Sequence, residues 1–370
     1  MALSVDADET ALDLFRRANR KPLRTGLAFL DEVSDGTPGA EKGVGLGDVV
    51  EVYGASGSGK SEVLINVVAQ HILPAWLGGE EQTAVYFDND GRLSILRLEQ
   101  LLKEKIMNNT TFQVKRAAEN GASIGGGSSE KHGAASTLQQ RQPHLDDDRL
   151  LASCLSRLSV VRPGNLFELL ASLEILRFEL GHRPAVVAVD GMGTYYWQDK
   201  MAHSCGGDAV SMQGAVARAL VRLATERPLI ILAAKLALFA SRAGSEEAVE
   251  HREYLPRVWQ RAVTHRVTVK RRQRRPPTEV HESSRGGFSL FTARVLSFKG
   301  STAASRGSGR RGWSRGAGAS AGSTGDEPAT YFFVVTDDGI HHVPAAAAAA
   351  TAGVGDERNK PCIHHHGELR

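Results

Sequence analysis

Cysteine is scarce in this sequence, with three residues in 370, at Cys154, Cys205 and Cys362. Three scattered cysteines cannot form a disulfide framework, and this favours a reducing, intracellular setting. No apolar run approaches the roughly 18 residues that a membrane helix needs. The N-terminal residues 1–21 contain acidic side chains and no continuous apolar stretch, so they do not predict a secretory signal.

Aromatic residues are also few, at 6% of the chain, so aliphatic side chains must supply most of the core. Hydrophobic residues make up 41%, which is enough for a large core. The net charge of +3 is too small to indicate a nucleic-acid partner by itself, so the distribution of charge matters more than its total. The length allows two domains or one large α/β domain with insertions.

Apolar runs alternate with amphipathic segments along most of the chain. The runs predict strands at 49–53, 83–87, 158–161, 185–189, 228–233, 288–298 and 331–335. The amphipathic segments predict helices at 61–72, 95–106, 166–180 and 211–226. Strands that are apolar throughout and alternate with helices indicate an α/β fold with a mostly parallel central sheet and helices on both faces.

Two segments rich in Gly, Ser and charged residues, 109–148 and 300–327, predict disordered insertions. We expect an N-terminal extension over 1–24 with a short helix from Thr10 to Asn19. The core is expected over 25–340, followed by a disordered tail over 341–370.

A phosphate-binding motif follows the strand at 49–53. The residues match G-x-x-x-x-G-K-[ST] at every fixed position, and they are Gly54, Ala55, Ser56, Gly57, Ser58, Gly59, Lys60 and Ser61. The glycines let the backbone N–H groups turn toward phosphate oxygens, and the following helix adds its positive end. We expect Lys60 to reach the β- and γ-phosphates and Ser61 to bind Mg²⁺.

Carboxylates follow two other predicted strands. Asp190 ends the apolar run AVVAV, and we expect it to hold Mg²⁺ together with Ser61. Asp88 and Asp90 follow the run TAVYF, and Asp90 is the better candidate for the base that polarises the attacking water. An aspartate is one methylene shorter than a glutamate, and a loss of about 1 Å in reach can lower a rate on the order of 10²-fold. Hydrolysis should therefore be slow.

Two other readings of the motifs are weak. A GTPase is disfavoured because the only Asn-Lys pair, at 359–360, is followed by Cys362 where a guanine-reading Asp is expected. Cys362 with the histidines at 364–366 is a single terminal cluster without a second ligand set, so it does not predict a metal site.

Several segments, taken in order, resemble the RecA-type recombinase ATPases and in particular the eukaryotic recombinase paralogues. The segments besides the P-loop are RTGLAFLDEV (24–33), HILP (71–74), VYFDNDGRLSILRL (85–98), VVAVDGMGTYYW (186–197), YLPRVWQRAVTHRV (254–267) and YFFVVTDDGI (331–340). Together they cover about 25–108 and 150–340. The P-loop is shared by many families, whereas this order of segments is much more specific.

The resemblance implies a RecA-like core that binds ATP and Mg²⁺ and acts in homologous-recombination repair of double-strand breaks. It implies a nuclear protein that works in a hetero-oligomer of recombinase paralogues and assists the recombinase on single-stranded DNA. It also assigns the catalytic position to Asp90 and the magnesium position to Asp190.

This sequence departs from the filament-forming recombinases in two ways. About 24 residues precede the core, where those recombinases carry a helical domain, so self-polymerisation is not expected. Lys235 stands where they place a Gln that senses the γ-phosphate. Either Lys235 contacts phosphate or the sensing step is lost. Both departures favour a nucleotide-gated assembly component over a fast motor.

DNA contact has several candidate segments. The resemblance places DNA-binding loops at 198–210 and 236–253, but neither is strongly basic. The run 266–275 holds six Lys or Arg residues and is open to three interpretations: a phosphate contact, a nuclear-import signal or a solvated loop. Arginines 306–315 around Trp313 are typical either of loose nucleic-acid binding or of a linker. Trp197 and Trp259 favour a core or interface role.

Two alternative functions remain open from the residues alone. One is a stand-alone P-loop phosphotransferase or transport ATPase, although no substrate motif accompanies the arginines at 250–275. The other is a scaffold that does not hydrolyse ATP.

Overall fold

The structure is a computed structural model of the 370-residue chain. It describes residues 22–34, 41–122, 143–179, 185–204, 211–227, 229–237, 253–272, 289–298 and 329–350. The N-terminal helix, the segment 300–327 and the terminal cysteine and histidines of the sequence analysis lie outside these residues. Within the described ranges, no helix is both long and apolar enough to cross a membrane.

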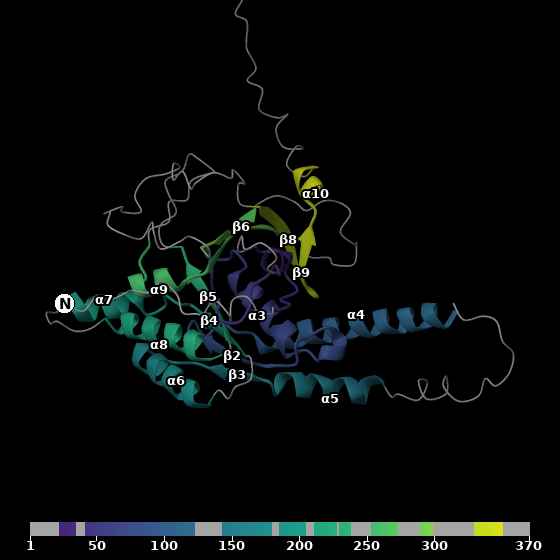
Figure 1. The fold of residues 1–370 in the computed structure, drawn as a ribbon, viewed down its shortest axis with the longest axis horizontal. Helices are drawn as coiled ribbons and strands as arrows, with labels where there is room; N and C mark the ends of the chain where they lie inside the picture. The colour runs from purple at the N-terminus through teal and green to yellow at the C-terminus, as the bar shows by residue number, and fades with distance from the viewer. Residues whose placement is uncertain are drawn as a thin grey trace, which may run out of the picture.

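The described residues form one central sheet of nine strands (Figure 1). The order across it is β3-β2-β4-β5-β1-β6-β7-β8-β9. The strands are β1 (Val49–Gly54), β2 (Thr83–Asp88), β3 (Leu158–Val161), β4 (Ala185–Asp190), β5 (Leu229–Leu236), β6 (His265–Arg272), β7 (Leu290–Ser297), β8 (Thr330–Thr336) and β9 (Gly339–Val343). From β3 to β6 neighbouring strands are parallel, and from β6 to β9 they are antiparallel.

Helices cover both faces of the parallel part, which confirms the predicted α/β fold class. One face packs against α2 (Ala28–Asp31), α3 (Lys60–Ile72), α4 (Ile95–Ala122) and α5 (Pro143–Leu155). The other packs against α6 (Leu166–Glu179), α8 (Met212–Glu226) and α9 (Arg257–Ala262). The remaining helices are η1 (Ala75–Leu77), α7 (Tyr196–Ser204) and α10 (Ala345–Ala350). Because successive residues of a strand point to opposite faces, Val50 and Val52 join the first core and Val49 the second.

Helical structure enters the segment 109–148 that was expected to be disordered. α4 continues to Ala122, and α5 begins at Pro143. Residues 113–118 (QVKRAA) are mostly good helix formers, which the overall composition of the segment conceals. The acidic run at 146–148 lies near the start of α5, where negative charge is favoured by the helix dipole. The segment that was predicted to be disordered therefore contains helical residues at both of its ends.

Ordered structure also passes the expected core boundary at residue 340. β9 pairs with β8, and α10 follows it. Val343 and Ala348 are buried against Leu290 and Val334. The alanine run was assigned to a disordered tail, and this was wrong because alanine has the highest helix propensity and can pack closely on a sheet.

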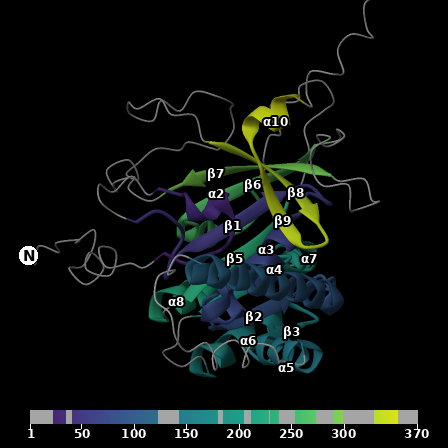
Figure 2. The same ribbon diagram turned by 90° about the vertical axis from the view of Figure 1, so that its right-hand side faces the viewer.

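The hairpin of β8 and β9 is fixed beside α3 and α4 (Figure 2). The Arg97 guanidinium of α4 donates to the carbonyls of Thr336 and Asp337 at 2.6 Å each and forms an ion pair with Glu62 of α3. The Asn66 amide oxygen accepts from Ile340 N–H at 3.4 Å. These contacts join the C-terminal hairpin to the helix that follows the P-loop.

Candidate nucleotide-binding site

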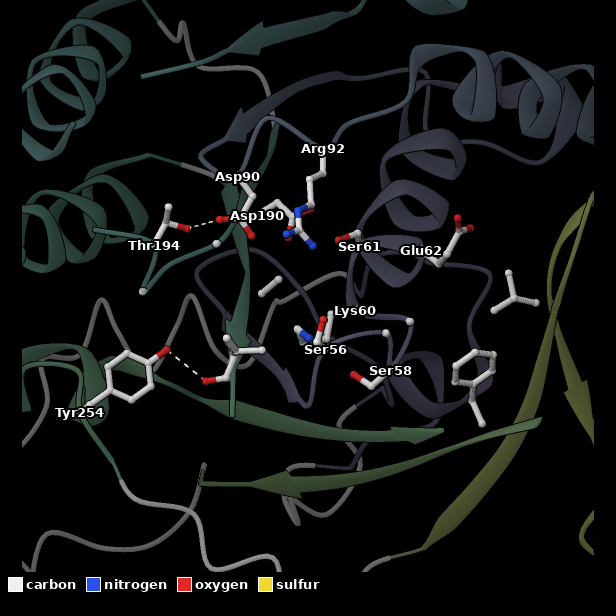
Figure 3. A pocket seen from close by; sticks show the side chains of 18 of the residues that line it. Ser56, Ser58, Lys60, Ser61, Glu62, Asp90, Arg92, Asp190, Thr194 and Tyr254 are labelled. Atoms are coloured by element: carbon white, nitrogen blue, oxygen red, sulfur yellow. Dashed lines mark hydrogen bonds between the residues drawn. The ribbon is translucent and has the colours of Figure 1, made fainter. Parts of the chain in front are cut away.

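A pocket of about 600 Å³ opens at the carboxyl ends of the parallel strands (Figure 3). The register brings these ends together, since Gly54 lies beside Leu236, Ala234 beside Asp190, and Asp190 beside Asp88. The carboxyl edge of an open parallel sheet is where such folds bind ligands, and the volume lies in the range of small-molecule sites. Its polar and charged lining residues include Ser56, Ser58, Lys60, Ser61, Glu62, Asp90, Arg92, Asp190 and Thr194.

The P-loop backbone adopts conformations that require glycine. Gly57 and Gly59 have φ values of +71° and +89°, in the left-handed region that other residues rarely adopt. A Cβ at Gly54 would overlap the Val269 carbonyl of β6 and the Ser58 hydroxyl, so β1 and β6 can approach only with glycine there. Residues 56–61 line the pocket.

Lys60 lies on the first turn of α3, and its Nζ donates to the Ala55 carbonyl at 2.7 Å. Burial lowers the pKa of Lys60, while the nearby carboxylates of Asp190 and Asp90 act in the opposite direction. The lysine is therefore folded back over the loop, close to both carboxylates that were predicted from the sequence.

Asp190 lies at the end of β4 and is buried. Its carboxylate accepts a hydrogen bond from the Tyr86 hydroxyl at 2.8 Å, and the Ser61 hydroxyl lies nearby in the pocket (Figure 3). Burial raises the pKa of Asp190, and the neighbouring hydroxyls of Ser61 and Tyr86 act in the opposite direction. The predicted magnesium pair, Ser61 and Asp190, thus meets across two elements that are 129 residues apart in sequence.

The two aspartates after β2 have different surroundings. Asp90 lines the pocket and accepts a hydrogen bond from the Thr194 hydroxyl. Asp88 is buried, forms an ion pair with Arg162 at 3.0 Å and accepts from the backbone N–H of Leu93. Asp88 stabilises the turn into α4, so Asp90 remains the candidate for a base.

The pocket residues fit a nucleoside triphosphate with Mg²⁺. Ser61 and Asp190 offer a hydroxyl and a carboxylate oxygen, the hard donors that Mg²⁺ prefers. The buried Ser58 hydroxyl, at the floor of the loop, has no hydrogen-bond partner among the described residues. Lys60 and Arg92 supply positive charge for phosphate.

Comparison with known proteins gives two relatives of the same kind. The DNA repair protein XRCC2 homolog of Arabidopsis thaliana is 25% identical over 270 residues, which cover 61% of this chain and 69% of that protein. The DNA repair protein XRCC2 of Mus musculus is 26% identical over 242 residues, covering 61% and 73%. The chain is similar to the XRCC2-type recombinase paralogues. The resemblance seen in the motif order is therefore confirmed.

No family model matches the chain. Among solved structures, the crystal structure of the RadB recombinase aligns with 84% of this chain and 99% of its own at 15% identity, with a TM-score of 0.45.

Lys235 answers one of the questions that the recombinase-paralogue resemblance raised. Its side chain is fully buried and does not line the pocket, whereas its neighbours Ala234 and Leu236 do. The Lys235 ammonium group instead contacts the carboxylates of Glu253 at 2.5 Å and Glu51 at 3.6 Å. The structure therefore does not support the first of the two alternatives, in which Lys235 contacts phosphate.

The structure places the other candidate segments in different settings. In the basic run 266–275, Arg266 is buried against Glu51, while Arg271 and Arg272 are exposed on opposite faces of β6. Residues 266–272 are therefore strand and not a solvated loop, one of the three interpretations of this run. Residues 198–204 of the first candidate loop are helical. Trp259 is a core residue as predicted, but Trp197 is 51% exposed and lines the pocket. In the part of the chain that the structure describes, no acidic, histidine or cysteine cluster could hold a metal by itself.

The pocket residues that the sequence analysis did not single out include Arg92, Thr194, Tyr254 and Phe291. Arg92 and Thr194 follow the predicted strands closely, so their positions near the carboxyl edge were a usable signal. Tyr254 and Phe291 come from segments far along the chain. Only the three-dimensional arrangement brings them to the P-loop, where a Cβ on Gly59 would lie 3.5 Å from the Phe291 ring.

Proposed function

We propose that this chain is an ATP-binding recombinase-paralogue subunit that acts in homologous-recombination repair of DNA double-strand breaks. The observation that carries the proposal is the convergence of Ser61 and Asp190 in one pocket with an intact P-loop. The names of the relatives, both DNA repair proteins, support the biological setting. We infer that the protein works in the nucleus.

In this proposal the backbone of residues 56–59 and Lys60 hold the phosphates, and Ser61 with Asp190 holds Mg²⁺. The metal ion neutralises charge on the phosphate oxygens when it is bound. Asp90 orients the attacking water, and Thr194 fixes the Asp90 carboxylate. The short reach of Asp90 favours slow hydrolysis. The nucleotide then serves mainly to stabilise an assembly with other recombinase paralogues.

DNA contact is proposed on the face of the antiparallel strands that α10 partly covers, beside Leu290 and Val334. Lys270, Arg272 and Arg294 share this face, since Thr268 pairs with Arg294 and Lys270 with Thr292. Arg272 and Arg294 are exposed and Lys270 is half-buried. Within the described residues, none of the three forms an ion pair with a carboxylate. The Arg272 guanidinium lies 5.3 Å from the centre of the Phe332 ring. A stripe of cations beside an aromatic ring suits a single strand, which offers phosphates and bases together.

The test of the nucleotide site is binding of ATP and ADP, with Mg²⁺, to the purified chain and to Lys60→Ala. Loss of the lysine should weaken binding of both nucleotides by at least about tenfold, the value of a charge-assisted hydrogen bond. Lys103→Ala is the matched control, because Lys103 is exposed on α4 and forms a surface ion pair with Glu99. Equal, negligible binding by the wild type and Lys60→Ala would instead support the scaffold alternative.

The test of the assembly role is recovery of the tagged chain from cells, with and without ATP. We expect another recombinase paralogue to co-purify with the wild type and to be recovered less with Lys60→Ala. Turnover of ATP at tens per second by the isolated chain, without DNA or partner, would contradict the assembly role and favour a stand-alone enzyme.

A further inference from the structure

Tyr254 forms a wall of the pocket at the end that holds Asp90 and Thr194 (Figure 3). Its hydroxyl donates to the Leu236 carbonyl at 3.1 Å. A Cβ at Gly193 would overlap this hydroxyl, so the glycine leaves the space that Tyr254 occupies. The ring also packs edge-on against Tyr196, with centroids 4.9 Å apart. The hydroxyl therefore lies at the pocket wall beside the segment that carries Thr194.

Behind Tyr254, three buried side chains and one that is 10% exposed form a closed ring of alternating charge. We call it the charge ring, and its members are Glu51, Lys235, Glu253 and Arg266. Lys235 contacts Glu253 at 2.5 Å and Glu51 at 3.6 Å. Arg266 contacts Glu51 at 2.6 Å and Glu253 at 3.1 Å. The ring joins β1, β5 and β6 to the residues that precede α9. Separating one member from its partners would leave a buried charge uncompensated, which is strongly destabilising. The four side chains are therefore held in one arrangement.

Glu253 also holds Tyr254 in place through hydrogen bonds to its backbone. The same Glu253 oxygen that receives Lys235 also accepts the backbone N–H groups of Tyr254 and Leu255, each at 3.0 Å. The Lys235 ammonium group lies 5.1 Å from the centre of the Tyr254 ring. Both the backbone and the ring of Tyr254 are therefore held by members of the charge ring.

We propose that Tyr254 binds the terminal phosphate of a nucleoside triphosphate in this pocket, and that Glu253 is the positioning residue that holds Tyr254 there. The inference rests on the proposed nucleotide site and deepens it. A phosphate oxygen is a stronger acceptor than the neutral Leu236 carbonyl, so the hydroxyl turns to the phosphate when a triphosphate is bound. A diphosphate lacks the group at this end of the pocket. Tyr254 thus discriminates between ATP and ADP, in place of a side chain at position 235.

The experiment compares the affinities of the full chain for ATP and for ADP, both with Mg²⁺, by calorimetry. Tyr254→Phe keeps the ring and removes the hydroxyl. ATP affinity should fall about tenfold, the value of one hydrogen bond to a charged group, while ADP affinity stays within about twofold. Tyr331→Phe is the matched control, since Tyr331 lies on β8 outside the pocket lining, and it should change neither affinity.

Glu253→Gln tests the positioning role, because it keeps the shape of the side chain and removes its charge. It should lower the ratio of ATP to ADP affinity in the same direction as Tyr254→Phe, and the double variant should lose no more than Tyr254→Phe alone. A purely structural role of Glu253 would instead weaken both nucleotides equally. Thermal unfolding of each variant verifies that the folded state is being titrated.

The outcomes separate this inference from the proposed function. If the wild type binds both nucleotides, Lys60→Ala loses both, and Tyr254→Phe keeps the wild-type ratio, then the role of Tyr254 is wrong and the nucleotide site stands. If the wild type binds neither nucleotide, both fail.

Discussion

Arg92 reaches the nucleotide pocket from the turn between β2 and α4, and Figure 3 shows its guanidinium directed toward Ser61 and Asp190. Its backbone N–H donates to the buried Asp88 carboxylate at 2.9 Å, which fixes the turn. Arg92→Gln should weaken ATP binding by about tenfold, because a charged phosphate contact is lost. Calorimetric titration with ATP measures this effect. Arg149→Gln, an exposed change on α5, is the control. Unchanged ATP affinity in Arg92→Gln would show that the guanidinium does not contact the nucleotide.

His71 gives a residue-scale prediction about pH. It is buried near the end of α3, and burial lowers the pKa of His71 to about 4. In the unfolded chain a histidine titrates near pH 6.5. Between pH 6.5 and 4 the unfolded chain therefore binds a proton that the folded chain does not. The free energy of unfolding should fall as pH falls through this window, by about 3 kcal/mol in total.

The substitution His71→Leu should remove this part of the pH dependence and leave stability near pH 7.5 unchanged or higher. Urea unfolding of wild type and variant at pH 7.5, 6 and 5 measures the difference. Because every other titrating group is common to both proteins, the difference isolates His71. Parallel stability curves over this range would refute the assignment.

At the scale of elements, β6 shows why a basic run has no single role. Strand alternation directs Arg271 toward Ser289 on one face and places Arg266 and Arg272 on the other. On that second face Arg266 is buried in the charge ring, whereas Arg272 is exposed at the end of the strand. Replacing Lys270, Arg272 and Arg294 together by Gln should lower the salt dependence of single-stranded DNA binding by about two in the log–log slope. Fluorescence anisotropy at several salt concentrations measures this slope.

The matched control for the DNA surface is Arg177→Gln with Arg222→Gln. Arg177 of α6 and Arg222 of α8 pair with Glu226 and Glu174 and do not belong to the β6 and β7 strands. This pair removes positive charge without touching the proposed surface. Equal loss of slope in both sets would mean that total charge, and not this face, governs binding.

The parallel strands and their helices were predictable because a strand buried on both faces is apolar throughout. β2 and β4 follow this rule up to the aspartates that end them, and β1 and β5 follow it except at Glu51 and Lys235. The aspartates could be placed at one edge because the strands are parallel. The helical ends of α4 and α5 were missed because composition hid their helix formers. Tyr254 could not be predicted, since its role depends on a charge ring built from four separate elements.

At the scale of the whole molecule, an aromatic stack links the N-terminal part of the core, the C-terminal hairpin and the P-loop. Phe333 of β8 stacks on Phe291 of β7 with centroids 5.3 Å apart and contacts Phe29 of α2 at 5.7 Å. Phe291 in turn lies beneath Gly59. The P-loop therefore rests on residues from both ends of the described chain.

The substitution Phe333→Ala should lower the free energy of unfolding by about 3 to 5 kcal/mol, because it leaves a cavity in this stack. ATP and ADP binding should weaken together, since Phe291 loses its support. Denaturant unfolding and calorimetry measure the two effects. Phe178→Ala, on α6 and 76% exposed, should change neither. If Phe333→Ala lowers stability but leaves nucleotide affinity unchanged, the aromatic stack does not support the nucleotide site.

The position of the C-terminal hairpin beside the P-loop predicts the effect of truncating mutations. Val335 of β8 is part of the nucleotide pocket, and the turn after it is held by Arg97. A nonsense codon or frameshift between positions 190 and 335 therefore removes one wall of the pocket while leaving the P-loop and both aspartates in the translated product. Alleles truncated late in the reading frame should be as severe as those truncated early, and survival of cells after DNA breakage should not distinguish them.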